Sequence, residues 1–83
     1  MIIDYHEAEQ TKQGIHFFVG VHFEDEPDSY YVILIDADLD GRLVRTDLNY
    51  NGMDCKYTFT NEEKHALLDY LNQQEIIPDR FYF

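Results

Sequence analysis

Residues 14–24 alternate between two kinds of side chain, and this alternation constrains the fold more than any other feature of the chain. One side carries Ile15, Phe17, Val19, Val21 and Phe23. The other side carries His16, Phe18, Gly20, His22 and Glu24. A period of two is typical of a β-strand with one buried face. After an acidic turn at residues 24–29, which contains Pro27, residues 30–38 are predicted to form the next strand.

Two turn signals extend the sheet. Asp40-Gly41 and Asn51-Gly52 are residue pairs that two-residue type I′ hairpin turns prefer, because both central positions need positive φ. The first turn predicts three pairs on one side of the sheet: Tyr31–Tyr50, Ile33–Leu48 and Ala37–Val44. The second turn predicts, on that same side, Tyr50–Met53, Leu48–Cys55 and Val44–Phe59. Since a slip of one residue would swap the faces, the agreement of two turns favours an antiparallel meander.

A helix is predicted after the sheet. Thr60 and Glu63 have the spacing of a capping box, in which each side chain bonds a free backbone amide of the other residue. The helix is expected over Asn61–Gln74, and Pro78 predicts the end of any regular continuation. Its core-facing side chains are predicted to be Leu67, Leu68 and Leu71.

The ends of the chain complete this fold. Residues 2–8 can supply a first strand, and the aromatic tail Phe81-Tyr82-Phe83 is expected to pack as an added strand or a cover. We therefore predict one α+β domain over residues 1–83. It is an antiparallel β-meander of four to five strands with one C-terminal helix packed on one face.

The net charge of the chain limits the kinds of partner that it can bind. The chain of 83 residues has 17 acidic and 6 basic residues and a formal net charge of −11. Such a surplus repels nucleic acid and anionic membranes and favours basic partners. It also exceeds the magnitude of about 2–8 that solubility asks of a small domain. We therefore expect no direct binding of nucleic acid or membrane, and a basic or nucleic-acid-binding protein as partner.

The face of the sheet away from the helix is predicted to be mixed. The same register sets Asp36 opposite Arg45 and Leu34 opposite Asp47. A five-residue loop before residue 30 would set three further pairs: His16 near Asp38, Phe18 near Asp36 and His22 near Val32. An apolar centre with a charged rim is common in protein-binding surfaces. The alternative is that the tail, the first strand or a second copy of the chain covers this face.

These observations favour a small acidic inhibitor that occupies the basic, nucleic-acid-binding surface of a target protein, as DNA mimics do. Anti-CRISPR, anti-restriction and nuclease immunity proteins include acidic chains of this size, and the comparison rests on size and charge alone. The candidate partner-binding residues are Glu24, Asp25, Glu26, Asp28, Asp36, Asp38, Asp40, Asp47, Phe18 and Leu34. The alternative is a structural or accessory subunit that self-assembles, with a homodimer interface at the sheet edges and residues 81–83.

A third possibility is calcium binding at the second hairpin. The stretch from Asp36 to Gly41 matches the first half of an EF-hand loop, with carboxylates at Asp36, Asp38 and Asp40, and Asp47 stands at position twelve. The flanking residues, however, alternate as strands rather than helices. In a strand Asp36 and Asp38 share one side while Asp40 lies in the turn, so a plain acidic hairpin is favoured.

Catalysis and cofactors are not expected. Ser29 lies in a predicted turn and Cys55 is predicted to face inward opposite Leu48, where a thiol acts as a small apolar group. His16 and His22 are about 20 Å apart along one strand, too far to bind one metal ion. A single cysteine, and an N-terminus without a basic or long apolar stretch, favour a cytoplasmic protein without disulfides.

Overall fold

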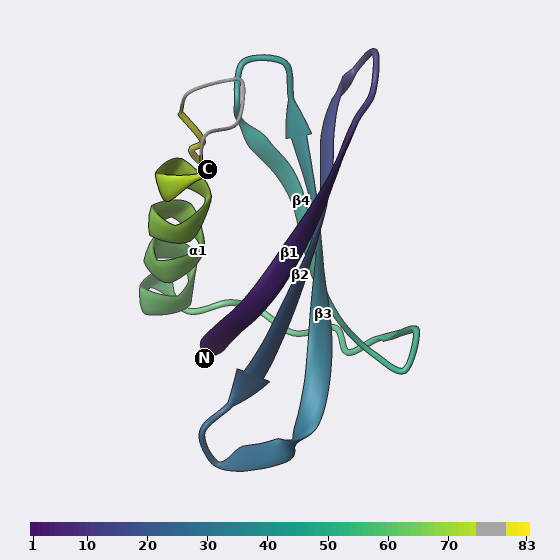
Figure 1. Ribbon diagram of the computed structural model, residues 1–83, viewed down its shortest axis with the longest axis vertical. Helices are drawn as coiled ribbons and strands as arrows, with labels where there is room; N and C mark the ends of the chain where they lie inside the picture. Colours follow the sequence, from purple (N-terminus) through teal and green to yellow (C-terminus); the bar gives the residue numbers. More distant parts are fainter. Residues whose placement is uncertain (75–79) are drawn as a thin grey trace.

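The computed structural model describes residues 1–74 and 80–83, and shows a twisted sheet with a helix against one of its faces (Figure 1). In this part of the chain five strands lie in the order β1-β2-β3-β4-β5, with every neighbouring pair antiparallel. The elements are β1 (Ile2–Gln10), β2 (Gly14–Phe23), β3 (Glu26–Asp38), β4 (Leu43–Tyr50), β5 (Met53–Asp54) and α1 (Asn61–Gln73). The predicted α+β meander with a C-terminal helix is confirmed. Pro78 lies outside the described residues.

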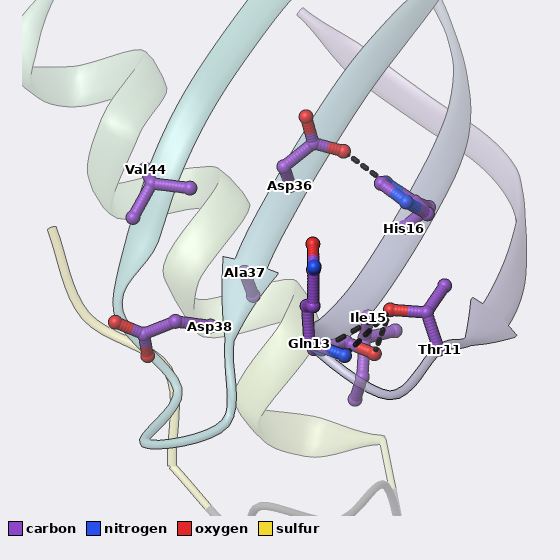
Figure 2. A pocket seen from close by; sticks show the side chains of 9 residues that line it. Thr11, Gln13, Ile15, His16, Asp36, Ala37, Asp38 and Val44 are labelled. Atoms are coloured by element: carbon purple, nitrogen blue, oxygen red, sulfur yellow. Dashed lines mark hydrogen bonds and ion pairs between the residues drawn. The ribbon is translucent and has the colours of Figure 1, made fainter.

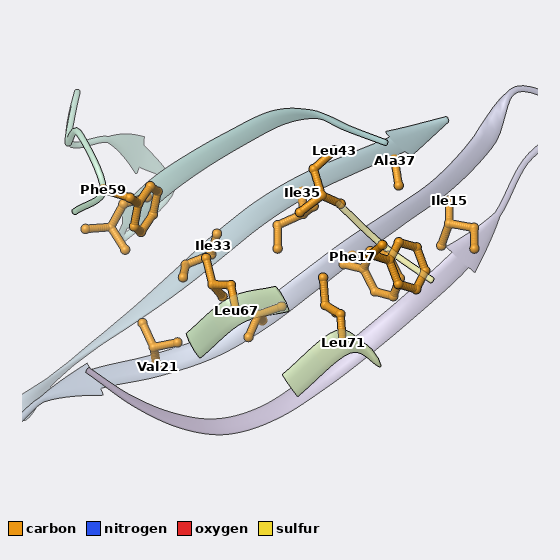
Figure 3. Close-up of a cluster of buried hydrophobic side chains, with 13 residues drawn as sticks. Ile15, Phe17, Val21, Ile33, Ile35, Ala37, Leu43, Phe59, Leu67 and Leu71 are labelled. Carbon is orange, nitrogen blue, oxygen red and sulfur yellow. The ribbon is translucent and has the colours of Figure 1, made fainter. Parts of the chain in front are cut away.

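The face of the sheet toward α1, here called the inner face, forms the hydrophobic core (Figure 3). The alternation in β2 produces it directly, because every second residue from Ile15 to Val21 is buried. From α1, Leu67 and Leu71 are fully buried and Leu68 is half-buried, as predicted. Burying one such side chain contributes about 1.5–3 kcal/mol. The buried residues are Ile15, Phe17, Val19, Val21, Ile33, Ile35, Ala37, Leu43, Leu48, Phe59, Leu67, Leu71 and Phe81.

The predicted capping box starts α1. The backbone N–H of Glu63 donates to Thr60 Oγ1 over 3.2 Å, and the backbone N–H of Thr60 donates to Glu63 Oε1 over 2.9 Å. Two amides that the first turn of a helix leaves without partners are thereby satisfied.

The aromatic tail packs on the inner face, in agreement with the prediction that it covers the sheet. Phe81 is buried, and its ring meets that of Phe17 edge to face at a centroid distance of 5.3 Å. The Asn72 side chain donates to the carbonyl of Phe81 and accepts from its N–H. Tyr82 bonds the backbone on both sides of Arg42, in a single parallel bridge. The tail therefore covers the same face as α1.

The turn between β3 and β4 corrects one prediction. The loop has three residues, closed by hydrogen bonds from Gly41 N to Asp38 O and from Asp38 N to Arg42 O. Gly41 has a φ of 93°, whereas Asp40 does not have the positive φ that a type I′ turn requires. The extra residue leaves a bulge, so that Ala37 pairs with Leu43 instead of Val44. Leu43 is consequently buried.

The second turn has the predicted geometry, but the strand after it is shorter than expected. Asn51 and Gly52 both have positive φ, and Tyr50 pairs with Met53. The strand ends at Asp54, and the positive φ of Lys56 turns the chain away from β4. The expected pair of Val44 and Phe59 is therefore absent from the register of the described strands. Phe59 instead enters the core from the segment before α1.

Cys55 was predicted to face inward opposite Leu48 as a small buried apolar group, and the burial is wrong. Its backbone N–H does donate to the carbonyl of Leu48 over 2.9 Å, which agrees with the predicted register. The thiol is nevertheless exposed, since the strand has already ended one residue earlier.

The hairpin of β2 and β3 is tighter than predicted. Its loop is Glu24-Asp25, and β3 begins at Glu26 rather than after Ser29. Pro27 lies where the register jumps from Phe23–Glu26 to His22–Tyr30, at an irregularity that needs no N–H donor. The partners of β2 are thus two residues away from those predicted. A shift of two leaves each residue on its predicted face.

Candidate protein-binding surface

The sheet face opposite α1, here called the outer face, is left open by the helix and the tail, which both lie against the inner face (Figure 1). The antiparallel register arranges its side chains in rows that run across the strands. Residues directly opposite one another share a face, with Cβ atoms about 4.5–5.5 Å apart. Each row can therefore be taken as one strip of surface.

The central row carries two apolar side chains between two acids. Glu7 of β1 lies opposite Phe18 of β2, Phe18 opposite Leu34 of β3, and Leu34 opposite Asp47 of β4. Phe18 is 39% exposed even though it lies in the second strand of the sheet. The predicted pair of Leu34 and Asp47 is confirmed, and the predicted neighbour of Phe18 is corrected from Asp36 to Leu34.

The adjacent row consists of three charged side chains and a histidine: Glu9, His16, Asp36 and Arg45. His16 Nδ1 lies within hydrogen-bonding distance of Asp36 Oδ1, and Arg45 Nη1 lies 4.0 Å from Asp36 Oδ2. Arg45 Nε also donates to Asp47 in the central row. The hydrogen bond and charge of Asp47, assisted by Asp36, raise the pKa of the Arg45 guanidinium above its usual value. Arg45 therefore neutralises part of the acidic charge in the centre of the face.

Aromatic side chains continue the apolar strip toward the other end of the sheet. Tyr5 lies opposite Gly20, and a side-chain carbon on Gly20 would overlap the Tyr5 ring. The glycine thus makes room for an aromatic ring that is 51% exposed. Val32, which lies opposite Gly20, and Tyr30 line a surface hollow of about 440 Å³. The outer face therefore exposes three large aromatic side chains, Phe18, Tyr5 and Tyr30.

The ten predicted partner-binding residues fall into three groups. Phe18, Leu34, Asp36 and Asp47 meet in the two rows at the centre of the outer face. The acids of the β2–β3 hairpin form a second group, namely Glu24, Asp25, Glu26 and Asp28. The remaining two, Asp38 and Asp40, lie at the opposite end of β3.

The two end groups do not form one site. The acidic hairpin and the acidic turn lie at the two ends of the 13-residue strand β3, which runs along the longest dimension of the molecule, 35 Å. The centre of the outer face is therefore the place where the predicted apolar and acidic residues come together.

The four aspartates considered for calcium do not converge. Asp38 Oδ1 accepts hydrogen bonds from the backbone N–H groups of Asp40 and Arg42, which makes it a cap of its own turn. Asp36 and Asp47 contact Arg45. Within residues 1–74 and 80–83, no group of three or more histidine, cysteine or acidic side chains could hold a metal ion.

A hollow of about 210 Å³ lies where the β1–β2 turn meets the end of β3 (Figure 2). His16 and Asp36 face each other at its edge, and Asp38 and Val44 lie on its β3–β4 side. Val44 is 59% exposed as a consequence of the bulge in β4. This hollow extends the charged row without adding a nucleophile.

Glu7 and Glu9 are surface acids that the sequence analysis missed. Both are exposed on the edge strand β1, and they complete the two central rows. Their register follows from the turn at residues 11–14, where Thr11 Oγ1 accepts hydrogen bonds from the N–H groups of Gln13 and Gly14. A threonine three residues before a glycine is the sequence signal for this turn.

In the part of the chain that the structure describes, no helix is long and apolar enough to cross a membrane. No protein-family model, curated protein or solved structure matches this chain. The candidate surface is therefore interpreted from its own geometry.

Proposed function

We propose that this chain is an acidic protein-binding module that docks its outer face on the basic, nucleic-acid-binding surface of a target protein and inhibits it. The observation that carries the proposal is the central row, in which Phe18 and Leu34 lie between Glu7 and Asp47 on a face without helix or tail. Apolar anchors inside a charged rim are typical of protein interfaces.

Charge and size support a DNA mimic in particular. The molecule measures 35 × 22 × 20 Å, and one turn of B-DNA is about 34–36 Å long. Such a turn carries about 20 phosphate charges, against a net charge of −11 on this chain. About half the charge of a DNA turn is thus spread over a similar length, which would steer a basic target toward the module.

The direct test is capture of a partner from a lysate of the source organism, with the tagged chain as bait and stepped salt for elution. We expect a basic nucleic-acid-binding protein that is released as salt rises and that DNA displaces. The charge variant Glu7→Gln/Asp47→Asn and the anchor variant Phe18→Ala/Leu34→Ala should both weaken its retention.

A matched control separates the face from bulk charge. Glu62→Gln/Asp69→Asn removes two charges as well, from exposed positions on α1. Retention should be almost unchanged in this control. Equal loss in the control and in the Glu7→Gln/Asp47→Asn variant would mean that net charge alone attracts the partner, and would contradict docking through the outer face.

Self-assembly is the second candidate, because Tyr82 and Phe83 are 41% and 42% exposed at the end of the tail. A homodimer through the tail would depend on these two side chains, since Phe81 is already used in the chain's own core. Light scattering decides between the two functions. A mass above that of the monomer which falls on deletion of residues 82–83, with no partner captured, would favour self-assembly.

A further inference from the structure

A separate hollow of about 300 Å³ lies on the inner side of the sheet, at the end where β2 and β3 are joined. It is here called the aromatic pocket, and its lining residues are Phe23, Asp25, Glu26, Tyr31, Leu48, Cys55 and Tyr57. These residues come from β2, the β2–β3 loop, β3, β4 and the segment before α1. The pocket shares no residue with the rows of the outer face.

Three aromatic rings form its walls. The ring of Phe23 meets that of Tyr31 edge to face at a centroid distance of 5.4 Å, and lies 6.2 Å from the ring of Tyr57. Two of these rings each contact one further ring. The ring centroids of Tyr50 and Tyr31 are 5.1 Å apart, and those of Phe59 and Tyr57 are 5.2 Å apart. The walls are thus held in place by packing rather than left free to collapse into the hollow.

Hydrogen bonds fix the two phenols. Tyr31 Oη donates to Glu26 Oε2 over 3.2 Å. Tyr57 Oη lies 2.9 Å from both carboxylate oxygens of Glu63, the residue that completes the capping box of α1. The pocket wall at Tyr57 is therefore tied to the start of the helix.

The charged side chains that line the pocket are all acidic. Asp25 and Glu26 contribute two carboxylates, and the lining contains no basic side chain among the residues described. Aromatic faces attract cations, and they do so best when the cation is weakly hydrated. A hard metal ion is less suited, because calcium takes six to eight oxygen ligands. Two carboxylates beside three rings fit an organic cation.

We propose that the aromatic pocket binds an arginine side chain of a basic protein. The planar guanidinium can stack on an aromatic ring while its N–H groups reach a carboxylate in a two-pronged contact. The Glu26 carboxylate keeps free lone pairs after accepting from Tyr31, and Asp25 stands next to it in the loop. This site goes beyond the proposed function of the outer face and stands without it.

The test is a nuclear magnetic resonance titration of the intact chain with N-acetylarginine amide, observed at the ring signals of Phe23, Tyr31 and Tyr57. We expect saturable shifts at these rings, weakened by salt. The neutral isostere N-acetylcitrulline amide should leave the signals in place, and N-acetyllysine amide with a free ε-amine should bind more weakly. Equal shifts with citrulline would overturn the cation site, and equal binding of lysine would overturn the assignment to arginine.

Matched variants locate the site. Asp25→Asn should weaken binding about two- to fivefold, whereas Asp28→Asn, the same change in charge outside the pocket, should leave it almost unchanged. Tyr57→Leu should cause a similar loss through the ring. Equal effects of Asp25→Asn and Asp28→Asn would show that arginine follows bulk charge, and would overturn the proposal.

Cys55 gives a second measurement that needs no variant. Its thiol is exposed and lines the pocket, so bound arginine amide should slow its alkylation by iodoacetamide, a neutral reagent. An unchanged rate at saturating arginine would overturn the location. The variant Phe18→Ala/Leu34→Ala should bind arginine normally, so failure of the pocket and failure of the outer face are distinguishable.

Discussion

Phe17 and Phe18 are neighbours in the chain and belong to opposite surfaces of the molecule. Phe17 is 1% exposed, in contact with the tail and the core, whereas Phe18 is 39% exposed on the outer face. The side chains of β2 alternate, and α1 and Phe81 cover only one side. The same residue type therefore stabilises the fold at one position and remains available to a partner at the next.

Charge follows the same division. No polar or charged residue is buried among the residues described, and the acids of the central rows all lie on the outer face. We infer that substitutions at the buried residues of the sheet act on the free energy of unfolding, and that substitutions at the exposed side chains of the outer face act on binding. The predictions below test how far this difference extends.

The largest effect is expected from alanine at the two phenylalanines. Phe17→Ala removes a buried ring that packs on Phe81, and should lower the free energy of unfolding by about 3–5 kcal/mol. Phe18→Ala should lower it by less than about 1 kcal/mol, as is usual for surface positions. Urea denaturation followed by circular dichroism measures both. Similar losses at the two positions would show that the outer face is part of a packed core.

The anchoring of the covering helix can be tested at its cap. Thr60→Ala removes the acceptor of the Glu63 N–H and should lower the free energy of unfolding by about 0.5–2 kcal/mol. Thr58→Ala, at an exposed threonine two residues earlier, is the matched control and should have little effect. If both variants lose the same stability, the capping box does not hold α1 on the inner face.

Gly20 is the place where the outer face should resist substitution. Gly20→Ala would push the new methyl group into the Tyr5 ring, and we expect a loss of about 1 kcal/mol. In the background of Tyr5→Ala the same change should be neutral or stabilising, because glycine weakens a strand interior. A double-mutant cycle by urea denaturation measures the coupling. Additive effects would contradict the contact between Tyr5 and Gly20.

The smallest effect concerns alkaline pH. The hydrogen bond to Glu63, with burial and the charge of Glu63 adding, raises the pKa of Tyr57 above its usual 10.0. The folded chain then keeps this proton when the unfolded chain loses it, so the stabilisation is complete below about pH 10 and falls as pH rises through the folded pKa. Tyr57→Phe should flatten the decline of the urea midpoint above about pH 10. If the urea midpoint of Tyr57→Phe falls with pH as steeply as that of the unmodified chain, the raised pKa of Tyr57 is contradicted.

The two hairpin turns show how far the sequence could predict this fold. Asp40-Gly41 and Asn51-Gly52 carry the same signal, and only Asn51-Gly52 has positive φ at both residues. At the first turn Asp38 caps the loop with its carboxylate, which favours three loop residues and a bulge. Dipeptide preference cannot distinguish these cases, because Gly41 suits both.

Some of the pairs on the candidate surface were predicted correctly, and others were not. Ile33 opposite Leu48 and Asp36 opposite Arg45 were correct, because the bulge between Leu43 and Arg45 offsets the extra residue of the loop and restores the predicted register. Glu7 and Glu9 were missed because the pairing of β1 is set by one side-chain turn at Thr11 rather than by hydrophobic pattern. Local alternation thus predicts which face a residue takes, while bulges and loop lengths decide its neighbours.

The central claim is that the outer face binds the partner. Amide hydrogen exchange on the complex with the captured protein tests it most directly, because protection is measured along every strand. We predict new protection in β1 and slower exchange at Phe18 and Leu34, with the exposed side of α1 unchanged. Protection confined to α1 or to residues 82–83, with the strands of the outer face unaffected, would contradict the account.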